Sequence, residues 1–152
     1  MIAHSSKDVV LCLAAGILMA ECTGVRPSGL GVKDSKLAPC PASPNCVSSQ
    51  AGDRDHSVQP IACTTDTPAA MADLKRIILS MKRSRIVTET GNYIHAEFTS
   101  AVWRFVDDVE FYADESAGVI HVRSASRLGT SDFGVNRKRV EAIRTAWKAP
   151  GR

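Results

Sequence analysis

The stretch with the most groups able to bind a ligand is RSASRLGTSDFGVNR, residues 123–137. This stretch comes directly after a predicted strand, whose apolar residues alternate, and it leads into a predicted helix. It carries small polar side chains and two glycines. A helix N-terminus offers free backbone N–H groups and a positive dipole end, so such a loop can hold an anion. Arginine adds bidentate contacts to a carboxylate or phosphate. The candidate ligand-binding residues are Arg123, Ser124, Ser126, Arg127, Ser131, Asp132, Asn136 and Arg137.

The same stretch also has a purely structural explanation. One of its small polar residues can cap the following helix, and one of its arginines can pair with the acids just before a predicted strand. The candidate caps are Ser131, Asp132 and Asn136, and the candidate ion pairs join Asp107 or Asp108 to Arg127 or Arg137. The segment matches no phosphate-loop pattern, so the sequence leaves both explanations open.

Ionisable residues at alternating positions form a second candidate site. If the predicted strands pair, one sheet face gathers His95, Glu97, Asp108, Glu110, His121 and Arg123. Histidine with carboxylates can perform acid–base chemistry or hold a divalent metal, but a solvated face with cross-strand ion pairs uses the same residue types. A serine nucleophile beside one of these histidines lacks the Gly-x-Ser-x-Gly elbow. We expect no cofactor and no resident metal, since the four histidines show no ligand spacing.

The elements that must position these residues are predicted from the spacing of apolar side chains. Pro68 after a capping Thr67 starts a helix whose apolar residues recur at three- and four-residue steps. Thr90-Gly91-Asn92 predicts a hairpin turn. The expected strands are 59–63, 86–89, 93–100, 108–113 and 119–124, and a final helix covers 136–147. The predicted fold class is α+β, an antiparallel sheet of about four to five strands with two helices on one face.

Charge is segregated along the chain, although the net charge is only +3. Five bases and no acid occur in the cluster formed by Lys75, Arg76, Lys82, Arg83 and Arg85. Residues 86–122 reverse the balance with seven acids and one base, and the C-terminal stretch is basic again. This pattern predicts pairing within the fold. The small net charge and the eight aromatic residues argue against a nucleic-acid partner.

The N-terminus has the pattern of a targeting segment. Residues 9–20, VVLCLAAGILMA, form an uncharged apolar run that is shorter than the ~20 residues needed to span a bilayer. Cys22 follows directly, as the lipidated cysteine of a bacterial lipoprotein does, but Glu21 stands where a small residue is usual. Lipidation at Cys22 is the expectation, and an uncleaved anchor or conventional secretion are the alternatives.

Residues 23–59 are rich in Pro, Gly, Ser and Asp and predict a tether followed by an ordered loop. Cys40 and Cys46 lie six residues apart in a proline-stiffened segment, and this spacing in an exported protein suggests a disulfide. Pairing of either one with Cys63 remains open from sequence. The expected organisation is a targeting segment over 1–22, a tether and Cys-Pro loop over 23–59, and a compact domain over 60–152.

Three motifs in order resemble the family called domain of unknown function 1499. They are CPASPNCVSS at 40–49, FVDDVEF at 105–111, and RSASR at 123–127 followed by SDFGVNR at 131–137. The resemblance covers roughly residues 37–147. It implies an exported bacterial envelope lipoprotein or a related exported or plastid protein, and it carries no catalytic residue.

These observations together predict an exported, membrane-anchored cell-envelope protein that faces the periplasm. We expect it to bind an envelope protein partner or a small anionic molecule through the 123–137 loop, without catalysis. The alternative is a hydrolase or metal-dependent enzyme that uses His95, Asp108, Glu110 and His121 on the polar sheet face.

Overall fold

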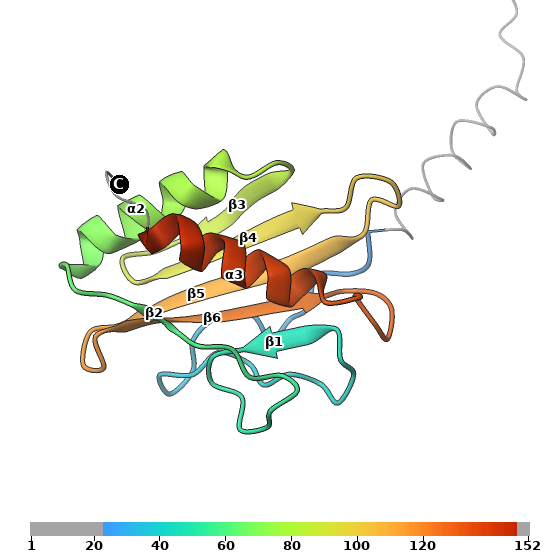
Figure 1. Cartoon of the computed structure of the whole chain (residues 1–152), viewed down its shortest axis with the longest axis horizontal. Helices are drawn as coiled ribbons and strands as arrows, with labels where there is room; N and C mark the ends of the chain where they lie inside the picture. The colour runs from blue at the N-terminus through green and yellow to red at the C-terminus, as the bar shows by residue number, and fades with distance from the viewer. Residues whose placement is uncertain (1–22, 149–152) are drawn as a thin grey trace, which may run out of the picture.

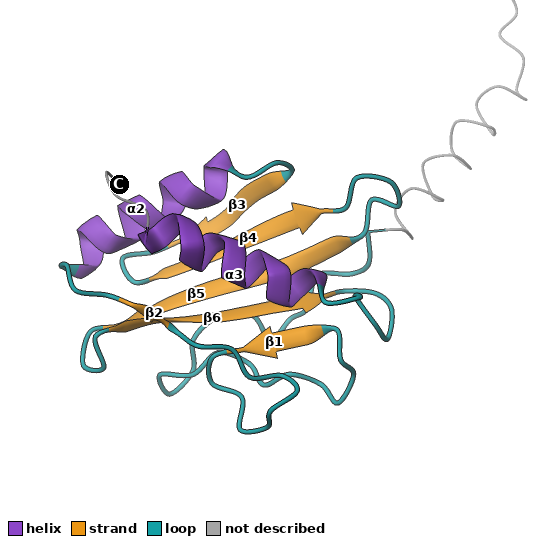
Figure 2. Ribbon diagram, in the orientation of Figure 1, coloured by secondary structure: helices purple, strands orange, loops and turns teal. Residues whose placement is uncertain are grey.

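The computed structural model describes residues 23–148 as an α+β domain, a sheet with two helices in front of it (Figures 1 and 2). The first two strands are β1 (Cys46–Ser48) and β2 (Ile61–Ala62), and helix α2 (Thr67–Ser80) follows. A meander comes next, made of β3 (Ser84–Glu89), β4 (Tyr93–Thr99), β5 (Val106–Asp114) and β6 (Val119–Ser126). Helix α3 (Val135–Lys148) completes the domain.

The sheet has six strands and all of its pairs are antiparallel, in the order β1-β6-β5-β4-β3 with β2 also on β6. The α+β class is therefore confirmed, but the predicted count of four to five strands is wrong. The missed strand is β1, which pairs with the end of β6 through Cys46 opposite Ala125. Three residues inside a Pro-rich loop show no alternation, so no pattern could predict this strand.

Helix α2 begins as the sequence predicts, but its cap is a different residue. Asp66 is the N-cap, and its carboxylate accepts a hydrogen bond from Ala69 N at 3.1 Å. Thr67 is already helical and buried, with Pro68 in the first turn, where a missing N–H costs nothing.

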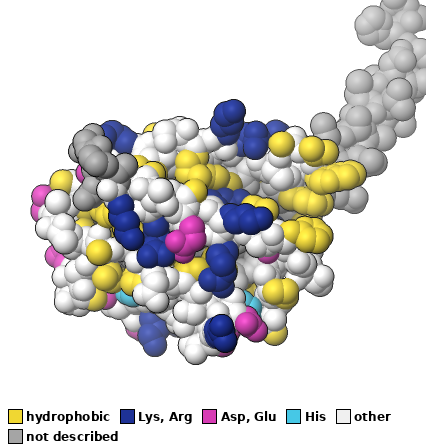
Figure 3. All heavy atoms as spheres, in the orientation of Figure 1, with side chains coloured by type: hydrophobic (Ala, Val, Ile, Leu, Met, Phe, Trp, Pro, Cys, Tyr) yellow, Lys and Arg dark blue, Asp and Glu magenta, His cyan; other side chains and the backbone are white. Residues whose placement is uncertain are grey.

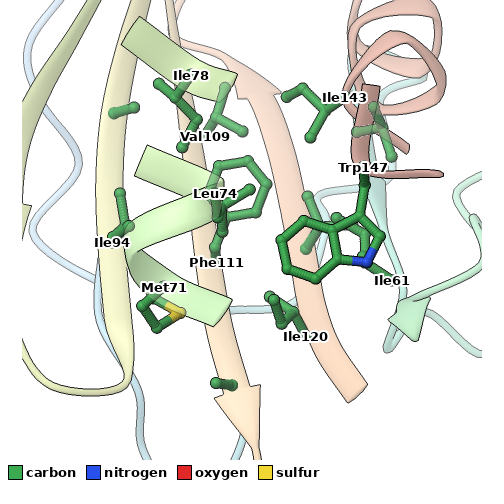
Figure 4. Packing of buried hydrophobic residues seen from close by; sticks show 14 of the residues in the cluster. Ile61, Met71, Leu74, Ile78, Ile94, Val109, Phe111, Ile120, Ile143 and Trp147 are labelled. Carbon is green, nitrogen blue, oxygen red and sulfur yellow. The ribbon is translucent and has the colours of Figure 1, made fainter. Parts of the chain in front are cut away.

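The core fills the space between the two helices and the sheet. Leu74 and Ile78 of α2 meet Phe111 of β5, while Ile143 and Trp147 of α3 lie over β6 (Figure 4). Phe111 and Leu74 are fully buried, and each contributes roughly 1.5–3 kcal/mol to folding by that burial. The indole N–H of Trp147 donates to the carbonyl of Ala62 at 2.9 Å, which joins α3 to β2.

Residues 23–59, predicted as a tether followed by an ordered loop, contact the sheet at several points. The blue segment of Figure 1 passes behind the sheet, on the face away from the helices. Gly31 N donates to the carboxylate of Glu110 at 2.7 Å, and Arg26 Nη2 contacts Glu97 at 2.6 Å. Leu37 is buried in a small cluster with Tyr93 and Tyr112. The sheet is therefore covered on both faces.

The disulfide prediction is confirmed. Cys40 and Cys46 are bonded, with their Cα atoms 5.6 Å apart, and Cys63 is a free, half-buried thiol. The bond closes the loop that precedes β1, whose first residue is Cys46. Cys22, the expected lipidation residue, lies outside the described residues. Within residues 23–148, the helices are too short or too polar to cross a membrane.

Candidate functional site

The sheet face away from the helices carries ionisable side chains from three adjacent strands. The register places Glu97 opposite Asp108, and Glu110 opposite both His95 and Arg123. Asp108 and Glu110 are 1% and 0% exposed. Burying a carboxylate costs several kcal/mol unless a cation and hydrogen-bond donors compensate it, so their partners decide what this face can do.

Glu110 is held by neutral and cationic donors together. Its carboxylate accepts from the Tyr93 hydroxyl at 2.8 Å and from Gly31 N at 2.7 Å. Arg123 Nη1 lies 3.3 Å from its other oxygen. Burial and the adjacent Glu110 carboxylate raise the pKa of Tyr93, so its hydroxyl remains a donor. The Glu110 carboxylate is thus satisfied within the domain, whereas the buried Nε of Arg123 has no hydrogen-bond partner among the described residues.

Asp108 is held by a histidine and an arginine. His95 Nε2 lies 2.8 Å from Asp108 Oδ1, and Arg127 contacts both carboxylate oxygens at 2.8 and 2.7 Å. Burial acts to raise the pKa of Asp108, but the hydrogen bonds from Arg127 and His95 outweigh it and lower that pKa. A histidine beside a carboxylate has the geometry of a catalytic base and its orienting group. Both side chains are enclosed, however, with 3% and 1% exposed.

His121 stands apart from this pair and makes contacts of its own. Its Nδ1 lies 3.2 Å from Ser49 Oγ, and its ring stacks on Tyr112. Ser49 Oγ also accepts from Val122 N at 2.9 Å, which ties the β1 end to β6. Burial lowers the pKa of His121. Between residues 23 and 148, no three His, Cys, Asp or Glu side chains are placed to hold a metal.

The loop residues predicted to bind a ligand are divided between the two faces of the sheet. On the helix side, Asn136 is fully buried and donates to Asn45 O at 3.1 Å and to Ser126 Oγ at 2.9 Å. Its carbonyl oxygen accepts from Ser124 Oγ at 2.5 Å and from Arg139 at 2.7 Å. Asn136 therefore holds the start of α3 to β6, and its buried amide makes these hydrogen bonds within the domain.

Other residues of that loop have structural roles as well. Asp132 accepts from Gly134 N at 2.9 Å and Asn136 N at 2.8 Å, and thereby caps α3. Arg137 donates to two backbone carbonyls, of Ser57 and Asp55, at 2.7 Å each. Ser131 Oγ accepts a long hydrogen bond from Phe133 N at 3.4 Å.

The two adjacent acids of β5 bind different arginines on opposite faces. Asp108 pairs with Arg127, which is one of the ion pairs expected from the sequence. Asp107 pairs with neither Arg127 nor Arg137, because it points to the helix side and meets Arg139 at 2.5 Å. Arg139 also lies over the Phe98 ring, 4.8 Å from its centroid.

Arg127, one of the eight predicted ligand residues, lines a concave site, which we call the arginine hollow. This hollow has a volume of about 490 Å³, within the range of ligand pockets. Five arginines and a single acid line it. Its lining residues are Thr23, Arg26, Arg83, Ser84, Arg85, Glu97, Thr99, Arg104, Val106 and Arg127. They come from five separate stretches of chain, and no sequence spacing could have brought them together.

The acid of the hollow is already neutralised. Glu97 accepts from Arg26 at 2.6 Å and from Arg85 and Arg127 at 2.5 Å each. Burial acts to raise the pKa of Glu97, but the hydrogen bonds from these arginines outweigh it and lower the pKa to about 2. Five positive charges against the two negative charges of Glu97 and Asp108 leave the hollow with a formal charge of +3.

Two arginines of the hollow have no acidic partner among residues 23–148. These are Arg83 and Arg104, whose side chains are exposed. Both adopt a left-handed backbone, with φ of 60° and 58°, which costs a residue with a side chain roughly 1–3 kcal/mol. Other bases of the predicted basic cluster do pair: Lys75 with Glu89 and Arg76 with Asp73. Strained, unpaired cations around one hollow are typical of a binding site.

Comparison with known protein families matches residues 36–147 to the family described as Protein of unknown function (DUF1499). The chain belongs to this family. The match contains Arg83, Arg85, Arg104 and Arg127 of the hollow, whereas Thr23 and Arg26 precede it. The resemblance drawn from the three motifs is thus confirmed over nearly the same residues. No curated protein matches the chain.

Replacing Arg127 with alanine leaves Asp108 buried without its arginine, whereas Glu97 keeps Arg26 and Arg85. We expect Arg127→Ala to lower the free energy of unfolding at pH 7 by about 3–5 kcal/mol, measured by urea denaturation. Arg85→Ala is the matched control, since Arg85 also binds Glu97 but its side chain is 68% exposed. Its loss should stay below about 1 kcal/mol. Equal losses in the two variants would contradict this account of the network.

The low pKa of Glu97 predicts a pH dependence of stability. A carboxyl whose folded pKa is about 2, against an ordinary value of 4.5, stabilises the fold above pH 4.5. That contribution disappears as the pH falls from 4.5 to 2, because the unfolded chain binds the proton first. Urea denaturation across this window should show a flatter pH profile for Glu97→Gln than for the parent. Glu115→Gln, at an exposed turn, should keep the parent's profile.

Proposed function

We propose that this protein is an exported, membrane-anchored domain of the bacterial cell envelope that binds a small anionic ligand in the arginine hollow. The observation that carries the proposal is the convergence of Arg83 and Arg104, both without an acidic partner in residues 23–148, on a hollow with a formal charge of +3. An anion there would relieve the repulsion among the arginines. The role of the protein is binding, without a chemical step.

The chemistry of the lining favours phosphate over a neutral ligand. Arginine forks bind phosphate and carboxylate oxygens through two parallel N–H groups. Arg83 Nε already donates to Thr99 O at 3.1 Å, so this side chain is oriented with its terminal nitrogens still available. The single predicted ligand residue that contributes is Arg127, and its role is to neutralise Glu97 and Asp108 beneath the hollow.

Support for export and anchoring comes from the sequence and from the disulfide. The apolar run at 9–20 precedes Cys22 directly, as in a lipoprotein signal. A disulfide between Cys40 and Cys46 fits the oxidising compartments outside the cytosol.

Anion binding is tested with pyrophosphate and the double variant Arg83→Gly/Arg104→Gly. Glycine adopts a left-handed backbone without strain, so we expect the variant to fold with an unchanged or higher melting temperature. Thermal shift at low ionic strength should show stabilisation of the parent by pyrophosphate. The variant should bind at least about tenfold more weakly, since each lost charge-assisted hydrogen bond is worth about 1.5–3 kcal/mol.

The control for this experiment is Arg54→Gln/Lys138→Gln, which removes the same charge from exposed positions elsewhere. If the control loses affinity equally, binding reflects net charge alone and the proposal is wrong. A parent protein that pyrophosphate does not stabilise would also overturn it.

Anchoring is tested by the Cys22→Ala substitution in cells. Since lipidation needs the thiol, the variant should leave the membrane fraction or accumulate as a heavier, unprocessed precursor. Fractionation and the mass of the purified chain measure both outcomes. Cys63→Ala, which removes the free thiol of the domain, should behave as the parent. Unchanged partitioning and mass in Cys22→Ala would indicate an uncleaved anchor or no lipid.

A further inference from the structure

Exposed apolar side chains gather at one end of the domain. Six of its nine exposed large hydrophobic residues come from the start of the described chain, the β4–β5 loop and the β6–α3 loop. These six, which we call the apolar rim, are Val25, Val102, Trp103, Phe105, Leu128 and Phe133. Val25, Phe133, Val102 and Trp103 are 91%, 88%, 77% and 70% exposed. A soluble surface rarely collects residues of this kind without a binding role.

The three segments of the apolar rim are neighbours in space. Both loops lie at the same end of the sheet, beside the start of the described chain (Figure 1), and apolar atoms cluster at that end of the surface (Figure 3). A Cβ added to Gly24 would lie 3.1 Å from a Leu128 side-chain carbon. Thr23 and Arg104 line the arginine hollow together. The apolar rim thus borders the hollow.

The chain leaves the domain at this same end. Thr23 is in the wall of the hollow, and Cys22, the proposed lipid-bearing residue, is its immediate neighbour in sequence. One residue spans at most about 3.6 Å, so there is no spacer between the anchor and the domain. An anchored chain must therefore hold this end of the domain at the bilayer surface.

We propose that the apolar rim inserts into the headgroup region of the membrane, with the arginine hollow on the phosphate of an anionic lipid. This inference rests on the proposed function, since it names the source of the anion and the surface that presents it. Tryptophan and other aromatic residues favour the interface between headgroups and acyl chains. Arginines beside them meet the negative potential of anionic lipids.

The β4–β5 loop places apolar side chains on either side of one strained residue. Val102, Trp103 and Phe105 flank Arg104, whose left-handed backbone turns the loop sharply. An apolar loop tip with a cation at its centre can bury its aromatic side chains while the guanidinium remains at the phosphate level. A protein-binding surface would not require the anchor to leave the domain beside it.

The intrinsic fluorescence of the full chain tests this proposal. The chain has two tryptophans, and Trp147 is only 4% exposed in the core, so a change on membrane contact reports Trp103. The protein is extracted and reconstituted into vesicles of phosphatidylcholine, with or without phosphatidylglycerol, that carry brominated acyl chains. We expect a blue shift and strong quenching of Trp103, greater with phosphatidylglycerol, and loss of both in Trp103→Phe.

A matched control places the probe at the opposite end of the sheet. Ala117 lies in the exposed β5–β6 turn, so Ala117→Trp in the Trp103→Phe background should show water-exposed emission. Its quenching should be less than about half that of Trp103. Equal quenching at the two positions overturns the proposal, and so does a Trp103 that remains accessible to aqueous acrylamide in vesicles.

Three readouts separate this proposal from the proposed function. Pyrophosphate binding without vesicles reports the hollow alone, fractionation of Cys22→Ala reports the anchor alone, and bromolipid quenching reports the apolar rim. Loss of quenching with intact pyrophosphate binding would show that the hollow binds an anion away from the bilayer. Concentration-dependent shielding of Trp103 in vesicle-free detergent would assign the rim to a second copy of the chain and overturn lipid insertion.

Discussion

Compensation of buried carboxylates on the two central strands is the constraint that organises this domain. The four carboxylates concerned are Glu97, Asp107, Asp108 and Glu110, and none is more than 8% exposed. An uncompensated charge at such depth would cost several kcal/mol, comparable to the whole stability of a small domain. Their partners therefore come from every layer: the N-terminal segment supplies Arg26 and Gly31, the β6 end supplies Arg127, and α3 supplies Arg139. Loss of one partner would thus leave a carboxylate uncompensated and would also weaken the attachment of the element that carries that partner.

The dipeptide Asp107-Asp108 shows how one strand secures both faces. Successive side chains of a strand point to opposite faces, so Asp107 reaches the helix side and Asp108 the side covered by residues 23–59. Arg139 on Asp107 fixes the start of α3, where Asn136 also binds β6. Arg127 on Asp108 fixes the end of β6. The sequence predicts that the segregated charges pair within the fold. In these two cases the acids lie on β5, and their arginines lie on α3 and at the end of β6.

Sequence patterns predict the elements whose periodicity is local and fail where the contacts are distant. Helices α2 and α3 and strands β4 to β6 have apolar spacings that are readable within a single window. The composition of residues 23–59 lacks any period and predicts only a tether followed by an ordered loop, so it cannot show that Arg26 binds Glu97, 71 residues away. The arginine hollow required the strand register before its members could be assembled. The polar residues of the 123–137 loop are compatible with ligand binding and with a structural role in the sequence alone, and the fold uses Asn136 and Asp132 to attach and cap α3.

Charged side chains without a partner in the described domain are a stronger sign of function here than the more numerous side chains that form ion pairs. The buried histidine and carboxylates of the polar face resemble catalytic groups in composition, but their hydrogen-bonding capacity is used within the domain. Arg83 and Arg104 differ, because both are exposed, unpaired within residues 23–148 and held in a strained backbone beside other arginines. Repulsion and strain at one place lower stability without any gain to folding, so they are best explained by a bound anion that offsets them. The hollow opens where the described chain begins, beside exposed aromatic side chains, so the proposed anion site and the proposed membrane contact lie at the same end of the domain.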